Sequence, residues 1–397
     1  MLLAAWPARW PGTVKMVSTP IDGQLDAGEP LAHPLIDPCK ERHEVSEQLR
    51  GGAVSAGLDV FLSGTVFIDM IFSGLPGLPA PGTELFVGGL GSAPGGSANM
   101  AVALSRLGLR VGLAAAFGDD MFGGYLWRTL AEQEGIDLSA SHRIRRWPTP
   151  VTVSLSYDAD RSMITYGEPL PFDKCKLVTE PPPAATCFVD LDDGPPEWAA
   201  KLRSNGALVF ADVGWDGTGV WSPAILDRLS AVDVFLPNAV EAMSYTRTES
   251  PEAALDALAA RVPVCVVKAG ADGAFGIDNL TGERAHASAI PVDALDPTGA
   301  GDVFDAGFVF GTLAGWCLED RLKFANLCAG LSVRHYSGSL GAPCWGEIAA
   351  WGEDPDVPES VLEQYGFVVP YIPPSAADDI ARAFPTVGYG AELTDLD

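Results

Sequence analysis

Long apolar runs are missing from this chain of 397 residues. A helix that crosses a bilayer needs about 18 to 20 consecutive apolar residues, and no stretch of the sequence reaches that length. The opening MLLAAWPARWPGTVKM is apolar but short, and it carries neither a basic leading region nor a clear cleavage site. We therefore expect a cytoplasmic protein without a membrane partner.

Blocks of positive charge are also missing. The sequence has 52 Asp and Glu against 25 Lys and Arg, which gives a formal net charge of −27. A chain this acidic repels the phosphate backbone, and no segment concentrates basic residues against that repulsion. The composition therefore excludes nucleic acid as an expected partner.

Cysteine and histidine patterns that hold metals are absent too. The seven cysteines are dispersed without a C-x-x-C pair, and the five histidines are scattered. Several cysteines lie in apolar runs such as VPVCVVKAG, where a buried, reduced thiol is typical. We expect neither a disulfide framework nor a Cys/His metal site.

Apolar, strand-like segments alternate along the chain with segments of helical periodicity. The strand-like segments are residues 59–72, 111–118, 206–214, 232–238 and 262–270. The helical segments are residues 98–108, 120–135, 222–230 and 253–262. This alternation predicts an α/β fold with a doubly wound, mostly parallel sheet covered by helices on both faces. Residues 273–288 break the rhythm and predict a hairpin, while Thr83–Val87 and 152–168 predict a small sheet projecting from the main one.

The stretch DPTGAGDVFDAGFVFG, residues 296–311, indicates the chemistry. In parallel α/β sheets, ligands bind beyond the carboxyl ends of the strands, often at helix N-termini. Gly299, Ala300 and Gly301 would present their amides at such a terminus and form an anion hole for phosphoryl oxygens. Asp302 beside this hole is suited to accept a proton from an attacking hydroxyl. The structural alternative for an isolated Asp at this position is a helix N-cap.

This stretch resembles the C-terminal signature of the ribokinase-like (PfkB) carbohydrate kinases, which transfer the γ-phosphoryl group of ATP to a sugar or nucleoside hydroxyl. The resemblance implies that Asp302 is the catalytic base and that residues 299–301 form the anion hole. It also implies that Asp296 and Thr298 help to hold an activating monovalent cation, for which potassium is a candidate. Downstream, Gly307 and Gly311 are expected to let the helix pack closely on the sheet.

The PNAVE motif places Asn238 and Glu241 three residues apart just after a strand, where they face the same way on a first helical turn. Alone, N-x-x-E is more often a helix cap with a solvated glutamate. Here its order in the chain matches the family motif, and the resemblance implies that both residues orient waters of a Mg²⁺ ion.

The segment from residue 66 to residue 99 carries the expected substrate contacts. Asp69, in GTVFID after a strand, is similar to the family's substrate-binding Asp, for which the structural alternative is a solvated or capping Asp. The stretch PGGSANMAVALSRLG resembles the N-terminal signature, so Gly95, Gly96 and Asn99 are expected to contact the substrate. The glycine pair lies one residue closer to the Asn than in many members, which leaves open which glycine faces the sugar.

The stretch KAGADG, with Gly270 and Gly273, resembles the family's nucleotide-proximal loop, and this resemblance implies that the nucleotide binds there. Lys268 replaces the Thr that often begins this loop, and it is suited either to meet ATP phosphates as a point charge or to extend past a strand end. Asn326 matches the family's adenine-facing helix.

The resemblance covers roughly residues 58–351. It implies a lid, formed by residues of about 66–94 and 149–169, that closes over the substrate and in many members makes a dimer contact, so a homodimer through the lid is expected. Residues 1–57 predict a flexible extension. Residues 352–397 predict an acidic extension whose YGFVVPYIPP segment is suited to docking on the surface.

Together these features predict an ATP- and Mg²⁺-dependent kinase of a sugar or sugar-like alcohol. One alternative is a nucleoside kinase of the same family, whose base would need an aromatic clamp such as Phe67, Phe72 or Tyr166. Another is a catalytically inactive scaffold. The scaffold would have lost the base or the anion-hole glycines, whereas this sequence retains both.

Overall fold

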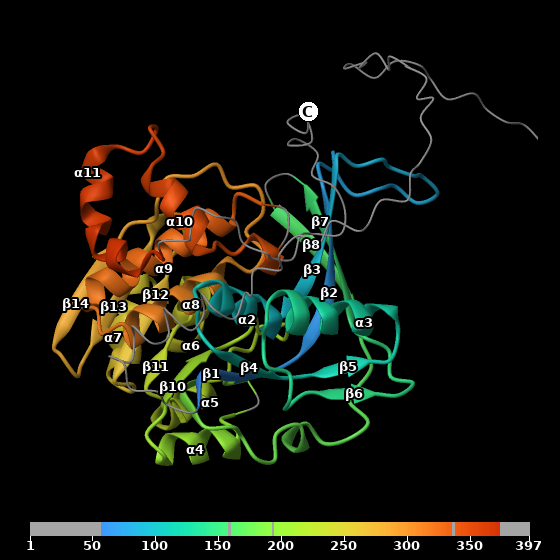
Figure 1. The fold of residues 1–397 in the computed structure, drawn as a ribbon, viewed down its shortest axis with the longest axis horizontal. Helices are drawn as coiled ribbons and strands as arrows, with labels where there is room; N and C mark the ends of the chain where they lie inside the picture. Colours follow the sequence, from blue (N-terminus) through green and yellow to red (C-terminus); the bar gives the residue numbers. More distant parts are fainter. Residues whose placement is uncertain (1–56, 158–159, 193, 336–337, 374–397) are drawn as a thin grey trace, which may run out of the picture. The chain divides into compact units, whose positions relative to one another are not determined.

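The computed structural model describes residues 57–157, 160–192, 194–335 and 338–373. Its main sheet has eight strands in the order β14-β13-β12-β11-β10-β9-β1-β4 (Figure 1). The strands are β1 (Leu58–Ser63), β4 (Val111–Ala114), β9 (Ala184–Asp190), β10 (Leu208–Asp212), β11 (Val234–Phe235), β12 (Val264–Lys268), β13 (Ala274–Asp278) and β14 (Glu283–Ala287). All neighbours from β12 to β4 pair in parallel, and β13 and β14 continue the sheet antiparallel.

Helices lie on both faces of this sheet, as the sequence predicted. They are α2 (Ser97–Arg106), α3 (Met121–Arg128), α4 (Glu197–Ser204), α5 (Ala224–Arg228), α6 (Ala239–Thr246), α7 (Pro251–Ala259), α8 (Ala300–Leu313), α9 (Leu318–Ser332), α10 (Trp345–Gly352) and α11 (Glu359–Leu362). Successive residues of a strand point to opposite faces. Val266 of β12 accordingly joins the core formed with α2, α8 and α9, whereas Cys265 and Val267 join the core formed with α4 to α7.

A separate four-stranded sheet, β3-β2-β7-β8, is visible beside the main one in Figure 1. It consists of β2 (Val66–Ser73), β3 (Gly89–Gly96), β7 (Val151–Tyr157) and β8 (Asp160–Tyr166). The expected small sheet is therefore present, but the strand expected at Thr83–Val87 is wrong. The strand is β3 instead, although half of its residues are glycines that disfavour extended structure. Continuous pairing with β2 over its whole length compensates for that poor propensity.

Two segments that were expected as single strands are broken. Residues 59–72 divide at Gly64 into β1 of the main sheet and β2 of the small sheet, so Asp69 lies within a strand and not after one. Residues 111–118 divide in the same way into β4 and β5 (Ala116–Gly118), which pairs with β6 (His142–Ile144). Composition alone could not reveal these breaks, because the residues on both sides are equally strand-like.

The packing of α8 also corrects an expectation. A Cβ atom on Gly307 would lie 2.9 Å from the Cα atom of Ala325 in α9, and one on Gly311 would meet the side chains of Trp316 and Arg321. These glycines therefore allow close approach of two helices, and not of a helix and the sheet.

The segment after α10 packs against the same helices. Residues Glu363–Tyr371 form η6, in which Tyr365 and Val368 are buried. The ring of Tyr365 lies 5.0 Å from that of Trp351, and the ring of Phe367 lies 4.8 Å from that of Trp316, both edge to face. The YGFVVPYIPP segment thus covers aromatic side chains of the main core through residue 373.

The boundaries of the kinase domain and of its two extensions remain predictions. The expected N-terminal extension lies outside the described residues apart from residue 57, and so does the part of the C-terminal extension after residue 373. Among the helices of the described residues, none is long and apolar enough to cross a bilayer.

Candidate active site

The site lies where the carboxyl ends of β1, β9 and β10 meet the start of α8. A cavity of about 190 Å³ opens there, and Asp302 contributes to its wall. Other lining residues come from the ends of the parallel strands, among them Ser63, Asp190 and Asp212. This is the edge at which open parallel sheets bind their ligands.

The N-terminus of α8 has a geometry that suits an anion. Gly299 precedes the helix with φ of 78°, a left-handed conformation that favours glycine. No side chain among the described residues caps this end of the helix. The amides of the first turn are therefore directed, together with the helix dipole, toward an incoming ligand.

Asp302 is half-buried in the first turn of α8 and accepts a hydrogen bond from Nδ2 of Asn99 at 2.9 Å. Burial raises the pKa of Asp302 to about 6, with the Asn99 bond and Lys268 opposing the shift and Asp212 adding to it. The carboxylate is therefore mostly ionised at pH 7 yet basic enough to take up a proton.

Asn99 joins α2 to this helix terminus. Its side chain is only 6% exposed, and its Oδ1 atom has no hydrogen-bond partner within the described residues. A Cβ atom on Gly299 would lie 3.2 Å from its Cγ atom, so glycine is needed for Asn99 to occupy this place. A buried, unpaired acceptor beside Asp302 is suited to bind a donor such as a hydroxyl group.

Asp69 lies on β2, where it is 4% exposed. A Cβ atom on Gly95 would lie 2.2 Å from Oδ2 of Asp69, and one on Gly96, whose φ is 65°, would lie 2.3 Å from the carbonyl oxygen of Thr65. Gly95 is thus the glycine that faces the Asp69 carboxylate, while Gly96 shapes the turn into α2.

Lys268 forms a buried ion cluster that the sequence did not predict. Its Nζ atom donates to Oδ2 of Asp212 at 2.8 Å and to both carboxylate oxygens of Asp305 at 3.0 Å. Burial lowers the pKa of Lys268, but the two carboxylates outweigh it and raise the pKa, so the ammonium stays charged. A Cβ atom on Gly301 would lie 3.6 Å from Nζ, which places this charge directly beside the expected anion hole.

Asp190, Asp212 and Asp305 are the residues that sequence reasoning missed. The first two end neighbouring parallel strands, a position that could have marked them. Burial raises the pKa of Asp190 to about 6, with the charges of Asp192 and Asp212 adding to the shift. Asp305 gave no signal, because its partner Lys268 lies 37 residues away in the chain.

Asn238 and Glu241 form a reciprocal capping box at the start of α6. Oδ1 of Asn238 accepts a hydrogen bond from the main-chain N–H of Glu241, and the main-chain N–H of Asn238 donates to Oε2 of Glu241, both at 2.9 Å. The glutamate is not solvated but 5% exposed, and burial, reinforced by Asp212, raises its pKa to about 7. An isolated parallel β-bridge pairs the main chains of Asn238 and Lys268, which places the capping box beside the ion cluster.

The loop before α8 contains a second unpaired acceptor. Oδ1 of Asp296 accepts from the amide and the hydroxyl of Thr298 at 3.0 and 2.7 Å. Oδ2 of Asp296 is buried without a hydrogen-bond partner in the described part of the chain. A buried carboxylate oxygen of this kind is a natural ligand for a cation.

The expected nucleotide residues gather at the end of β14. Gly273 has φ of 85°, and a Cβ atom there would lie 2.0 Å from the carbonyl oxygen of Ala287. Nδ2 of Asn326 donates to the same oxygen at 2.8 Å. Gly270 has φ of 59° and opens the loop. Asn326 thus ties α9 to the end of β14, and its contact with a nucleotide stays a prediction.

The protein has an α/β fold with a small second sheet, and an acidic residue lies at a glycine-rich helix N-terminus. This combination is typical of proteins that bind phosphorylated small molecules. The family model described as pfkB family carbohydrate kinase matches residues 79–174 and 196–344. The chain therefore belongs to the pfkB family of carbohydrate kinases.

Relatives of known activity agree with this assignment. A nucleoside kinase of Methanothermobacter thermautotrophicus is 30% identical over 318 residues, which cover 77% of this chain and 100% of the relative. An ATP-dependent ribose-1-phosphate kinase of Halopiger xanaduensis is 29% identical over 269 residues, covering 66% of this chain and 86% of the relative. The protein is accordingly a kinase of the sugar and nucleoside class.

Solved structures confirm the ribokinase-like fold. Arabidopsis thaliana ribokinase in complex with ribose and ATP superimposes with a TM-score of 0.59 at 23% identity, over 72% of this chain and 96% of that one. An Escherichia coli protein described as ribokinase II, in complex with ATP and Mg²⁺, gives a TM-score of 0.62 at 20% identity, over 75% and 99% of the two chains.

Proposed function

We propose that the protein transfers the γ-phosphoryl group of ATP to a hydroxyl group of a sugar or sugar-like alcohol. The observation that carries the proposal is the half-buried carboxylate of Asp302, which has a pKa of about 6 and lies on an uncapped helix N-terminus at the wall of a cavity. A base and an anion hole within one helical turn are what in-line phosphoryl transfer requires.

In this mechanism the substrate is held from two sides. Asp69 accepts hydrogen bonds from its hydroxyl groups, and Gly95 and Gly96 let it lie against the backbone. The unpaired Oδ1 atom of Asn99 accepts a further hydroxyl, while Nδ2 orients Asp302. Asp302 then removes the proton of the hydroxyl that attacks the γ-phosphorus.

The transferring group is stabilised by the start of α8. The amides of Gly299, Ala300 and Gly301 donate to the equatorial oxygens, on which negative charge spreads in the transition state. Lys268 adds a positive charge directly beside Gly301. Because Asp212 and Asp305 already bind its ammonium group, Lys268 acts mainly as a fixed charge that also holds α8 to the sheet.

Two cations fit the residues that are present. Among the described residues no three His, Cys, Asp or Glu side chains are grouped to hold a metal directly. Asn238 and Glu241 would therefore hold Mg²⁺ through its water molecules, and the ion would neutralise phosphate oxygens. The unpaired Oδ2 of Asp296, with Thr298, suits a monovalent cation such as potassium.

The nucleotide would lie on the loop of Gly270 and Gly273, with its base toward Asn326. The ATP dependence printed for the Halopiger relative and the ATP in both solved structures support this assignment. The small sheet would act as the lid, because it carries Asp69 and closes water out of the site.

A nucleoside kinase is the second candidate, favoured by the relative from Methanothermobacter. Alternation along β2 places Phe67 on the same face of the lid as Asp69, and places Phe72 on the opposite face. The pairing of Tyr166 with Val151, and of Val151 with Ile68, puts Tyr166 on that opposite face as well. Phe67 is therefore the aromatic residue of the three that suits a base.

The test measures ADP release with ATP and Mg²⁺ across pentoses, hexoses, sugar acids and nucleosides, for the wild type and Asp302→Asn. We expect release that depends on one substrate class and falls by about 10²- to 10⁴-fold in the variant. Activity on nucleosides alone would favour the second candidate. A protein that neither turns over any substrate nor binds ATP would overturn the proposal in favour of the inactive scaffold.

A further inference from the structure

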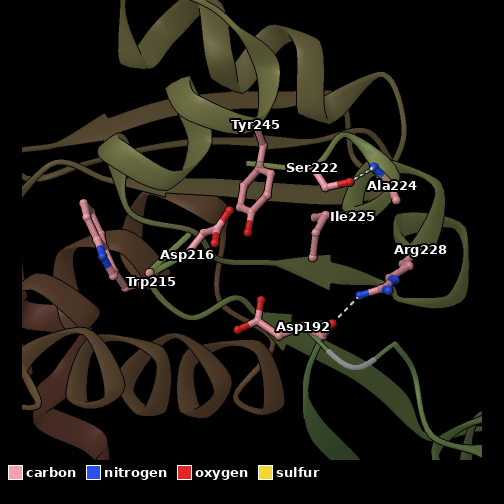
Figure 2. A pocket seen from close by; sticks show the side chains of 9 residues that line it. Asp192, Trp215, Asp216, Ser222, Ala224, Ile225, Arg228 and Tyr245 are labelled. Carbon is pink, nitrogen blue, oxygen red and sulfur yellow. Dashed lines mark hydrogen bonds between the residues drawn. The ribbon is translucent and has the colours of Figure 1, made fainter. Parts of the chain in front are cut away.

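A second pocket shares the chain segment Asp212–Asp216 with the active-site cavity. Its volume is about 310 Å³, and Figure 2 shows its lining side chains. The active-site cavity is lined by the beginning of this segment, and the second pocket by its end, including Trp215 and Asp216. The remaining walls come from the loop after β9, from α5 and from α6.

The charged side chains of this pocket differ in how many hydrogen bonds they make within the chain. Asp216 accepts from the amides of Thr218 and Trp221, one on each carboxylate oxygen, and is thereby fixed in place. Arg228 donates through Nη1 to the carbonyl oxygens of Leu191 and Asp192, so its charge is held against the backbone. Among the described residues, the carboxylate of Asp192 accepts only from the main-chain amide of Gly214, through Oδ2. Its Oδ1 atom thus remains available to a ligand.

Tyr245 of α6 provides an independent sign of a ligand. Its side chain is 5% exposed, yet its hydroxyl group makes no hydrogen bond within the described residues. Figure 2 shows the hydroxyl end of the ring directed into the pocket, toward Asp192 and Asp216. The hydroxyl group is therefore open to the pocket that Tyr245 lines, where it is suited to contact an atom that the chain does not supply.

The rim of the pocket is aromatic. Trp215 is 68% exposed, and its ring lies edge to face with Trp221 at 5.1 Å. Trp221 in turn lies edge to face with Tyr245 at 5.2 Å. These contacts hold the indole of Trp215 at the rim although it is exposed. An indole face beside carboxylates attracts organic cations.

We propose that this pocket binds a small organic cation whose ammonium group lies between Asp192, the Tyr245 hydroxyl and the face of Trp215. A bare metal ion suits the pocket less, because no three metal-binding side chains are grouped anywhere in the described ranges. A neutral polyol could hydrogen-bond to the two carboxylates, but it would gain none of the charge–charge attraction that a cation gains from them. The cation is bound outside the active site, so the inference is independent of the kinase reaction.

The test is isothermal titration calorimetry of the full chain, without ATP or sugar, using choline as the probe. Its neutral isostere, 3,3-dimethyl-1-butanol, is the matched control ligand, and putrescine and agmatine test primary-amine and guanidinium groups. We expect saturable binding of at least one of the three cations, weakened by added salt, with the isostere bound at least about tenfold more weakly than choline if choline binds.

Single substitutions test whether the cation binds in this pocket. Asp192→Asn and Tyr245→Phe should each weaken binding of the preferred cation by about tenfold or more, as expected when an electrostatic contact or hydrogen bond to a charged group is lost. Asp227→Asn removes the same charge from an aspartate that is 86% exposed and outside the pocket, and should leave binding unchanged. Thermal unfolding of each variant checks that it folds. The proposal is overturned if no cation binds, if the isostere binds as well as choline, or if Asp227→Asn weakens binding as much as Asp192→Asn.

Discussion

At the scale of single residues, the carboxylate of Asp302 lies in surroundings that disfavour its charge. Burial is the main cause that raises its pKa from 3.8 to about 6. Such a group does not affect stability below about pH 3, where the carboxyl is protonated in the folded and unfolded states alike. As the pH rises from about 4 to about 6, the unfolded chain ionises while the folded state keeps the proton, and stability is lost.

Asp302→Asn should therefore stabilise the fold at pH 8 and much less at pH 4. We expect a gain of about 1 to 2 kcal/mol in the free energy of unfolding, reduced from the full shift because the carboxylate borders a cavity. Urea unfolding at both pH values measures the difference. Asp227→Asn is the control, and an equal gain of Asp302→Asn at both pH values would contradict this explanation.

The glycine that faces Asp69 allows a second test at this scale. Gly95→Ala would bring a methyl group within 2.2 Å of the Asp69 carboxylate and displace it. We expect the KM for the sugar substrate to rise by about tenfold or more, with a smaller effect on the KM for ATP. Gly124→Ala is the matched control, because a Cβ atom there meets nothing within 4 Å. Steady-state kinetics measure both KM values for each variant. If Gly95→Ala and Gly124→Ala had equal KM values for the sugar, Asp69 would not hold the substrate.

At the scale of elements, η6 stabilises the pair α8 and α9 from outside. Val368 of η6 is 3% exposed, whereas the neighbouring Val369 is 65% exposed. Val368→Ala should lower the free energy of unfolding by about 1 to 2 kcal/mol, since it removes two packed methyl groups. Val369→Ala should change it by less than about 0.5 kcal/mol. Thermal and urea unfolding compare the two, and equal effects would mean that η6 does not dock in solution.

At the scale of the whole molecule, the lid has an apolar outer face. Ile164 and Tyr166 of β8 are 66% and 55% exposed on the face opposite Asp69. If the homodimer that the family resemblance implies forms through this face, the wild type sediments as a dimer and Ile164→Asp sediments as a monomer. Leu280→Asp, at a hairpin turn where the leucine is 75% exposed, should leave the dimer intact. A wild-type monomer in analytical ultracentrifugation would refute the dimer.

The sequence predicted what is encoded locally. The strand and helix alternation, the hairpin of β13 and β14, and the start of α8 near Asp302 all depend on neighbouring residues, and the structure contains them. Contacts between distant segments were not predictable. The ion cluster of Lys268 with Asp305 and the approach of Gly307 to α9 depend on how helices are placed, which no local pattern records.

The break between β1 and β2 at Gly64 has a consequence for the order of substrate binding and proton removal. Only two residues connect β1, which belongs to the rigid sheet that positions Asp302, with β2, which carries Asp69. The group proposed to grip the acceptor and the group proposed to activate it thus stand on different sheets that only two residues connect. If the small sheet closes over the acceptor as proposed, the base meets a hydroxyl group only when an acceptor has drawn the two sheets together. Water, too small to bridge them, would leave the nucleotide intact.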